Sequence, residues 1–171
     1  LRKQLENNLN VVETSSFVRL FDAVSSIAGI RHTATYEAQA AIEFESVMDE
    51  TASESYHFEL NDSEIDYREL LRQLVRDVRA GVESAVISAK FHNAVAELIL
   101  RLSLQYRESL KLNKVALSGG CFQNVALLKK ACRLLKKNDF EILTHKLVPP
   151  NDGGLALGQA AVAARQLKVK S

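Results

Sequence analysis

The chain has 171 residues, 47% of them hydrophobic and 25% charged, which is typical of a globular domain large enough to bury a core. Its formal net charge of +1 gives no electrostatic basis for a nucleic-acid or membrane-surface function. No apolar run of 18 residues predicts a membrane span, and the first residues carry no signal-peptide pattern.

The first half is predicted to be mainly helical. Apolar residues at three- and four-residue steps predict a helix over Phe17–Ile27, with Gly29 at its C-terminal cap. A second helix is expected over Tyr36–Met48. Two short runs, Tyr56–Leu60 and Glu64–Tyr67, are separated by turn residues 61–63 and predict a β-hairpin.

The second half is predicted to contain two long helices followed by alternating strands and helices. The expected elements are helices Arg68–Arg79 and Val82–Leu110, a strand at Lys114–Ser118, a helix at Asn124–Leu135, a strand at Phe140–His145 and a helix at Leu155–Gln166. The strand–helix–strand order is typical of a crossover that joins two parallel strands. We therefore expect one helix-rich α/β domain over residues 1–171, with a small, partly parallel sheet.

Gly119 and Gly120 stand where the first of these strands turns into a helix. Glycine lets a backbone approach a ligand closely, and the following helix start offers free N–H groups to an anion. The spacing matches neither G-x-x-x-x-G-K-[ST] nor G-x-G-x-x-G. The residues alone therefore leave a structural turn and a ligand-binding loop as equal alternatives.

Asp152 lies in PPNDGG, the connection that follows the second strand. Its carboxylate could cap the last helix, which is the commoner role, or bind a metal. Because both connections follow strands of one crossover unit, we expect Gly119, Gly120 and Asp152 to lie side by side. Ligands of open α/β sheets bind at this edge, which favours a site there.

The remaining reactive residues form no recognisable site. The histidines His32, His57, His92 and His145 are scattered and make no H-x-x-x-H pair, so no complete metal site and no catalytic residue is assigned. His92, on the longest helix, is expected to be a core or surface residue rather than a ligand. Cys121 and Cys132 fit neither a zinc spacing nor a disulfide framework, and reduced thiols in the cytoplasm are expected.

Five segments resemble a known family. TSSFVRLFDAVSSIAGI, TYEAQAAIEFE, SAKFHNAVAELI, VALSGGCFQNVALL and LTHKLVPPNDGGLALGQA resemble, in this order, the C-terminal part of the nickel–iron hydrogenase maturation carbamoyltransferases of the HypF type. The resemblance implies the second lobe of an actin/Hsp70/sugar-kinase (RNase H-like) fold. It implies a multidomain enzyme that uses carbamoyl phosphate and ATP, through carbamoyl-adenylate, to carbamoylate the C-terminal cysteine of a HypE-type partner.

The resemblance also assigns residues to an adenine-nucleotide site, namely Asp22, Glu37, Gly119, Gly120 and Asn124. The glycines and Asn124 are expected to approach the nucleotide, whereas the two acids are expected to hold the ribose. No partner nucleic acid or membrane is implied.

The same resemblance makes Asp152 a ligand of a divalent metal, zinc or iron, which histidines of the first lobe complete. Three positions depart from the family pattern: Val18 and Ala38 stand where we expect glycine, and Cys121 stands where we expect valine. Glycine permits closer approach of a nucleotide than a β-branched residue does.

Two alternatives to a carbamoyltransferase lobe remain open. One is the lobe of an ATP-dependent, sugar-kinase-like phosphotransferase, and the other is a non-catalytic docking lobe. The sequence begins with Leu1, and its only methionine is Met48, so we expect a piece of a longer chain. Such a piece is expected to fold but to lack carbamoyl transfer, because the first lobe and the adenylate-forming domain are missing.

Overall fold

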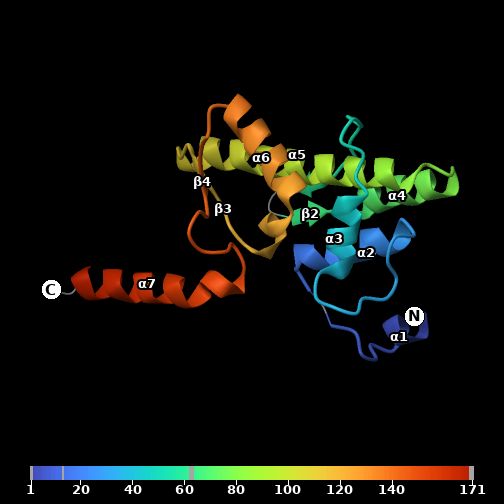
Figure 1. The fold of residues 1–171 in the computed structure, drawn as a ribbon, viewed down its shortest axis with the longest axis horizontal. Coiled ribbons are helices and arrows are strands. Elements are labelled where there is room, and N and C mark those ends of the chain that lie inside the picture. The colour runs from blue at the N-terminus through green and yellow to red at the C-terminus, as the bar shows by residue number, and fades with distance from the viewer. Residues whose placement is uncertain (1, 13, 62–63, 170–171) are drawn as a thin grey trace.

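A computed structural model describes residues 2–12, 14–61 and 64–169 (Figure 1). The helices are α1 (Arg2–Glu6), α2 (Phe17–Ile27), α3 (Gln39–Ser46), α4 (Arg68–Arg79), α5 (Ser84–Leu110), α6 (Val125–Lys137) and α7 (Leu155–Val169). The strands are β1 (Glu59–Asn61), β2 (Glu64–Asp66), β3 (Lys114–Leu117) and β4 (Glu141–Thr144). Two single-turn 3₁₀ helices, η1 (Gly120–Gln123) and η2 (Asp152–Gly154), precede α6 and α7.

The strands form two separate pairs. β1 and β2 are antiparallel, with Leu60 opposite Ile65, which confirms the predicted hairpin, although residues 62–63 of its turn lie outside the described residues. β3 and β4 are parallel, in a register that runs from Lys114 opposite Glu141 to Leu117 opposite Thr144. The predicted crossover through α6 is thus confirmed, and both strands end at the same edge.

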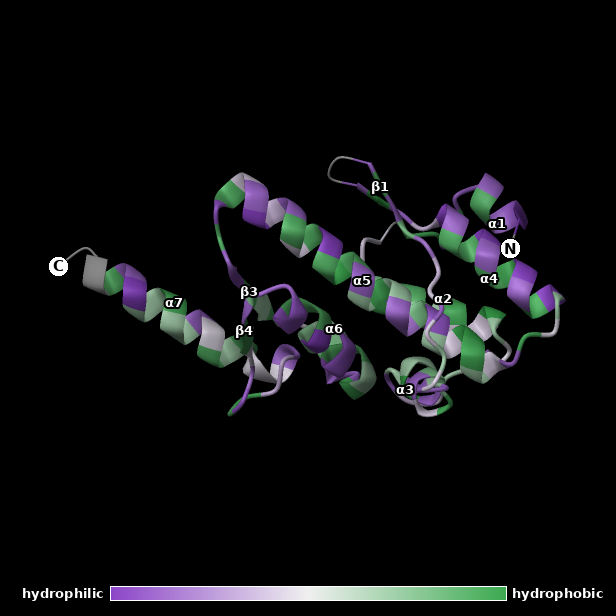
Figure 2. Ribbon diagram, turned by 90° about the horizontal axis from the view of Figure 1, so that it is seen from above, coloured by the Kyte–Doolittle hydropathy of each residue, from purple (hydrophilic) through white to green (hydrophobic). Residues whose placement is uncertain are grey.

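The 27-residue helix α5 runs through the middle of the molecule; α6 crosses it in Figure 1 and lies alongside it in Figure 2. Its buried side chains lie on more than one face, as its pattern predicted: Ile87, Ser88, Ala89, Phe91, His92, Ala94, Val95, Ala96 and Leu98. One half of α5 packs in a core with α2, α3 and α4. The other half contributes to a smaller core beneath β3, β4 and α6, centred on Leu117, Leu135 and Phe140.

Several helices end in the same left-handed cap. At the end of α2, Gly29 has φ +77°, its N–H donates to the Ser26 carbonyl and the Ile30 N–H donates to the Ser25 carbonyl. This pairing is the Schellman motif, and it confirms Gly29 as the predicted helix end. The same pair of hydrogen bonds follows α4, where Gly81 has φ +74°. Because Gly81 and Val82 complete that cap, α5 begins at Ser84 rather than at Val82.

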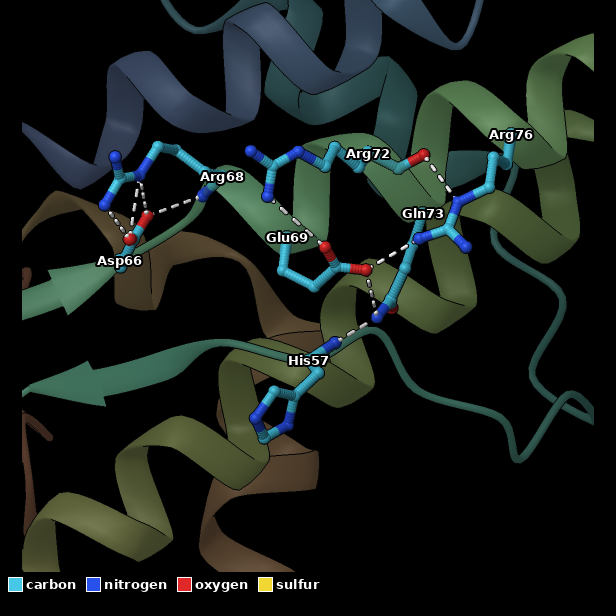
Figure 3. Close-up of polar contacts among 7 residues, drawn as sticks. All are labelled: His57, Asp66, Arg68, Glu69, Arg72, Gln73 and Arg76. Carbon is cyan, nitrogen blue, oxygen red and sulfur yellow. Dashed lines mark hydrogen bonds and ion pairs between the residues drawn. The ribbon is translucent and has the colours of Figure 1, made fainter.

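The hairpin is fastened to the start of α4 by polar contacts (Figure 3). The Asp66 carboxylate accepts the Arg68 backbone N–H at 2.8 Å and also pairs with the Arg68 guanidinium. The hydrogen bonds from Arg68 lower the pKa of Asp66 to about 2. Farther along, the Gln73 side chain accepts the His57 backbone N–H at 3.2 Å. The short strands are thus attached to the neighbouring helix as well as to each other.

The terminal helices lie outside the cores. α1, which the sequence pattern did not predict, has no buried residue. α7 stands apart from the other helices in both views (Figures 1 and 2), and it exposes the large apolar side chains of Leu155, Leu157, Val162 and Leu167. Over the described part of the chain, no helix is both long enough and apolar enough to cross a membrane.

The backbone conformation of Ala38 shows why glycine is expected at this position. Ala38 precedes α3 with φ 60° and ψ 10°, a left-handed conformation that an L-residue with a Cβ adopts only at a cost. The second helix accordingly begins at Gln39 and ends at Ser46, so it is shorter than the predicted Tyr36–Met48. The glycine that the family pattern calls for is the residue suited to this conformation.

We therefore predict that Ala38→Gly stabilises the chain by about 1 kcal/mol, because glycine removes the steric cost of the left-handed conformation. Urea unfolding at neutral pH measures the change. The matched control is Ala41→Gly inside α3, which makes the same chemical change at a helical position and is expected to destabilise by about 1 kcal/mol. A loss of stability in both variants would contradict the prediction.

His92 is fully buried at the centre of the main core, as a core histidine rather than an exposed one. Its ring stacks on Phe44, with centroids 5.4 Å apart and planes 29° apart, and meets the edge of Phe21 at 5.6 Å. Nδ1 donates a hydrogen bond to the Ser88 carbonyl at 2.8 Å. Burial lowers the pKa of His92 to about 4, despite the opposing effect of that carbonyl.

This lowered pKa predicts a pH dependence of stability. The unfolded chain takes up a proton at His92 near pH 6.5, whereas the folded chain does so only near pH 4, so stability falls as the pH drops between these values. We expect a loss of about 2 kcal/mol from this residue between pH 7 and pH 5. In His92→Phe the loss should disappear, which urea unfolding at the two pH values measures.

The control for this experiment is His57→Gln, which changes an exposed histidine. It should keep the wild-type pH dependence. Equal slopes in the wild type and His92→Phe would show that His92 is not the titrating group.

Candidate functional site

The connections after β3 and β4 lie against each other at the edge where both strands end. The Gly119 N–H donates to the Pro150 carbonyl at 2.8 Å. Ser118 Oγ and His145 Nε2 lie 2.8 Å apart, and they too join the first residues after the two strands. The prediction that the Gly119–Gly120 turn and the loop of Asp152 lie side by side is therefore confirmed.

Both connections have shapes that require glycine. Gly119 has φ 106° and ψ 162°, a region of backbone space that is essentially confined to glycine. In the second loop, a Cβ on Gly154 would lie 2.9 Å from the Pro149 carbonyl oxygen, which is closer than real Cβ contacts allow. The shapes of the two loops thus depend on glycine at these positions. A pocket lies beside both loops.

A pocket of about 680 Å³, here called the loop pocket, opens between these connections and one side of α7, from Leu155 to Gln166. Gly119, His145, Asn151 and Asp152 contribute to its lining. Asn151 Oδ1 accepts the Gly153 N–H at 3.1 Å, so Asn151 performs the capping role that the sequence left open for Asp152. In the described part of the chain, the exposed Asp152 carboxylate has no hydrogen bond or ion pair, and it faces the loop pocket unpartnered.

The described residues of the loop pocket do not make up a complete set of metal ligands. Asp152 and His145 are ligand types that zinc and iron accept, and both line the pocket. Across residues 2–12, 14–61 and 64–169, however, no three His, Cys, Asp or Glu side chains come together in a way that could hold an ion. The residues present therefore fit a partial site, and a metal would need ligands from outside this chain.

A second pocket, here called the helix pocket, lies between α2, α3, η1 and the start of α6, with a volume of about 220 Å³. Its apolar lining comes from Val18, Phe21, Ala38, Ala41, Ile42 and Cys121. Its polar lining comes from Glu45, Gln123 and Asn124, with Gly120 beside them. Segments about 100 residues apart in the sequence therefore enclose one cavity, and both glycine departures, Val18 and Ala38, lie in its wall.

The two pockets adjoin at the glycine pair. Gly119 lines the loop pocket and Gly120, the next residue, lines the helix pocket. A single elongated ligand that passes Gly119 and Gly120 could therefore reach an apolar cavity at one end and an unpartnered carboxylate at the other.

The start of α6 is already capped by the protein, contrary to the expectation of free N–H groups there. Asn124 Oδ1 accepts the Leu127 N–H at 2.7 Å, which is an N-cap worth about 1 kcal/mol. Glu45 Oε1 accepts the Ala126 N–H at 2.8 Å. Because a carboxylate occupies this position, a phosphate is repelled from the start of α6, and the helix pocket is suited to an uncharged group.

The predicted site residues converge in part. Gly120 and Asn124 line the helix pocket, whereas Gly119 and Asp152 line the loop pocket. The two predicted ribose acids, Asp22 and Glu37, line neither of the two pockets. Each is instead the chain neighbour of a residue that lines the helix pocket, Phe21 or Ala38.

Asp22 and Glu37 lie at the surface. Asp22 forms an ion pair with Arg19 at 3.1 Å on α2, and Glu37 is exposed. Their contact with a nucleotide stays a prediction.

Three residues of the site were not predicted as parts of it. One is Glu45, which caps α6 from a position that the spacing of motifs does not reveal. Another is His145, which meets Ser118. The third, His92, reaches Asn124 from the core: Asn124 Nδ2 lies 2.8 Å from His92 Nε2. Only the position of His145 gave a signal in the sequence, because His145 and Ser118 are the last residues of the two strands predicted to be parallel.

The Cys121 thiol lines the helix pocket but is not activated. Burial raises its pKa, although it stands at the start of η1. This direction agrees with the interpretation of Cys121 as an inert, half-buried thiol that replaces a similar apolar side chain.

Comparisons with known proteins identify the family of this chain. Residues 1–159 match the family described as "Carbamoyltransferase, Kae1-like Domain, second subdomain". The carbamoyltransferase HypF of Synechocystis is 38% identical over 160 residues, which cover 90% of this chain and 20% of that protein.

Two solved structures are similar. A crystal structure described as full-length HypF in the phosphate- and nucleotide-bound form superposes with a TM-score of 0.91 and 42% identity, over 96% of this chain and 22% of that one. The crystal structure of T.kodakarensis HypF has a TM-score of 0.86 at 24% identity over 97% of this chain and 22% of that one, which shows the shared fold.

The predicted fold class is therefore confirmed: a helix-rich lobe with a small, partly parallel sheet, of the Kae1-like type. The chain spans about one fifth of the length of the relatives that it matches. It belongs to the HypF carbamoyltransferase family, as the second subdomain of the Kae1-like carbamoyltransferase domain.

Proposed function

We propose that this chain is the nucleotide-binding lobe of a HypF carbamoyltransferase and that it folds as one domain over residues 1–171. The observation that carries the proposal is the pair of pockets that adjoin at Gly119 and Gly120 in a member of this family. A similar HypF structure is described as nucleotide-bound. ATP is the ligand whose elongated shape and unequal ends match this pair of pockets.

The chemistry of each pocket sets the direction of the nucleotide. The apolar wall of the helix pocket, which includes Val18, Ala41 and Ile42, suits a planar base. Glu45 at the start of α6 repels a phosphate from that end. The phosphates would then extend past Gly119 toward the loop pocket, with the ribose near the surface acids Asp22 and Glu37.

The complete reaction draws on parts beyond this chain. In the proposed reaction, carbamoyl phosphate and ATP form carbamoyl-adenylate, and its carbamoyl group passes to the C-terminal cysteine of a HypE-type maturation protein in the cytoplasm. Asp152 would contribute one ligand to a divalent metal, zinc or iron, which would help to fix the phosphate end. The histidines that complete this metal site, and the domain that forms the adenylate, would come from other domains of the whole protein.

The first prediction of this proposal concerns binding. Gly120→Val should weaken the binding of a non-hydrolysable ATP analogue at least tenfold, because the new side chain occupies the helix pocket. The fold should tolerate the change, since a Cβ at Gly120 meets no atom within 4 Å. Isothermal titration measures affinity in this chain, alone and joined to the first subdomain of a HypF relative.

Ala80→Val is the control for the binding experiment, because it enlarges an exposed residue that lines neither pocket. It should leave the affinity unchanged. Absence of ATP binding in both the isolated and the joined wild-type protein would contradict the proposal and favour a docking lobe.

The second prediction concerns catalysis. This chain alone should show no carbamoyl-phosphate-dependent exchange between ATP and pyrophosphate, because the adenylate-forming domain lies outside it. Exchange should appear when the chain is part of a whole HypF protein. Robust exchange by the isolated chain would contradict this division of labour.

A further inference from the structure

A chain of hydrogen bonds links the core of α5 to the mouth of the helix pocket. It runs from the Ser88 carbonyl to His92 Nδ1 at 2.8 Å, from His92 Nε2 to Asn124 Nδ2 at 2.8 Å, and from Asn124 Oδ1 to the Leu127 N–H at 2.7 Å. Both ends are backbone groups, one a carbonyl that only accepts and the other an N–H that only donates. These ends fix the polarity of every group between them.

The polarity follows step by step from the two ends. The Ser88 carbonyl requires the proton of the neutral His92 ring on Nδ1, so Nε2 carries a lone pair and accepts. The Leu127 N–H requires the amide oxygen of Asn124, so the amide nitrogen must face His92. The two requirements agree at the central contact, where the Asn124 NH₂ donates to the bare Nε2.

The His92 ring is held rigidly in this orientation. Phe44 stacks on one face and Phe21 and Phe91 meet it edge-on, while its exposed surface is zero. Burial also lowers the pKa of His92, so the ring stays neutral at physiological pH and its Nε2 stays an acceptor. The hydrogen bond from His92 to the α5 backbone therefore determines which group of Asn124 faces His92.

We propose that His92 is a positioning residue that fixes the Asn124 amide so that the helix pocket presents an N–H donor to its ligand. The inference rests on the proposed nucleotide site. The Asn124 oxygen is turned to α6, and one hydrogen of its NH₂ is used by His92. The second hydrogen has no partner in the described part of the chain, and Asn124 lines the pocket.

This polarity selects the ligand atom that meets Asn124. An N–H donor pairs with an acceptor, such as an unprotonated ring nitrogen of a purine, and not with an exocyclic amino group. We therefore expect the adenine base to turn a ring nitrogen, rather than its amino group, toward Asn124.

The first test needs no nucleotide. Long-range ¹⁵N correlation spectra of the imidazole rings at pH 7 should show His92 protonated on Nδ1 and bare on Nε2. A His92 ring protonated on Nε2 would overturn the inference, because Asn124 would then have to turn its oxygen toward the ring.

The second test measures ATP binding by titration in the wild type and in two variants of one position. His92→Phe keeps an aromatic ring in the core but removes the acceptor, and should weaken ATP binding about tenfold. His92→Gln places an amide oxygen near the position of Nε2, and should recover most of that affinity. A merely structural role for His92 would instead make the more polar, less well packed glutamine variant the weaker binder.

A double-variant cycle with Asn124→Ala completes the binding test. If His92 acts through Asn124, adding His92→Phe to Asn124→Ala should cause no further loss of affinity. Additive losses would overturn the inference. Leu74→Ala is the control for general destabilisation, because it empties a fully buried position in α4 that lines neither pocket, and it should leave ATP affinity unchanged.

Analogues of ATP that lack one ring nitrogen test the polarity itself. In the wild type, one of the 1-, 3- and 7-deaza analogues should bind about tenfold more weakly than ATP, and Asn124→Ala should abolish this difference. Equal binding of all three to the wild type would overturn the inference while leaving the nucleotide site intact. Failure of the wild type to bind ATP at all would instead overturn the proposed function, and the ring tautomer would then decide the positioning role.

Discussion

The hydrogen bond between His92 and Asn124 joins the two halves of this lobe. On one side it continues into α5, the helix that organises both cores, and on the other into the cap of α6 and the helix pocket. An unpaired buried imidazole nitrogen would cost about 1–3 kcal/mol, so the packing of α6 on α5 is tied to one relative position. The position of Asn124 in the helix pocket is thus fixed by a residue of the main core.

The two pockets differ in how the sequence forms them. The loop pocket depends on backbone shape, which Gly119 and Gly154 provide within short loops. The helix pocket depends on tertiary packing, because α2, α3 and α6 meet there only when the core has formed. The base end of the site is therefore set by tertiary packing, whereas the phosphate end is set by the local backbone shape of two loops.

This division explains which features could be predicted from the sequence. The periodicity of apolar residues and the positions of glycines predicted both ends of α4 correctly. They also predicted the end of α2, the hairpin and the parallel pair, since these features depend on neighbours in the sequence. The same reasoning placed Gly119 beside the loop of Asp152. It could not reveal that Glu45 caps α6 from 81 residues away, or that Ala38 adopts a left-handed conformation and delays α3. Those features arise from contacts and strain that only the folded chain creates.

The two-stranded parallel pair has a further consequence. Parallel strands are normally buried inside larger sheets, whereas β3 and β4 pair only with each other in the described part of the chain. α5 and α6 cover one face, but Leu143 on β4 remains half exposed. Each strand therefore offers a row of backbone donors and acceptors to a further strand, and the lobe carries a template for β-augmentation directly beneath its ligand edge. A strand that paired with β3 or β4 would also brace the two glycine-rich loops, because both follow directly from these strands.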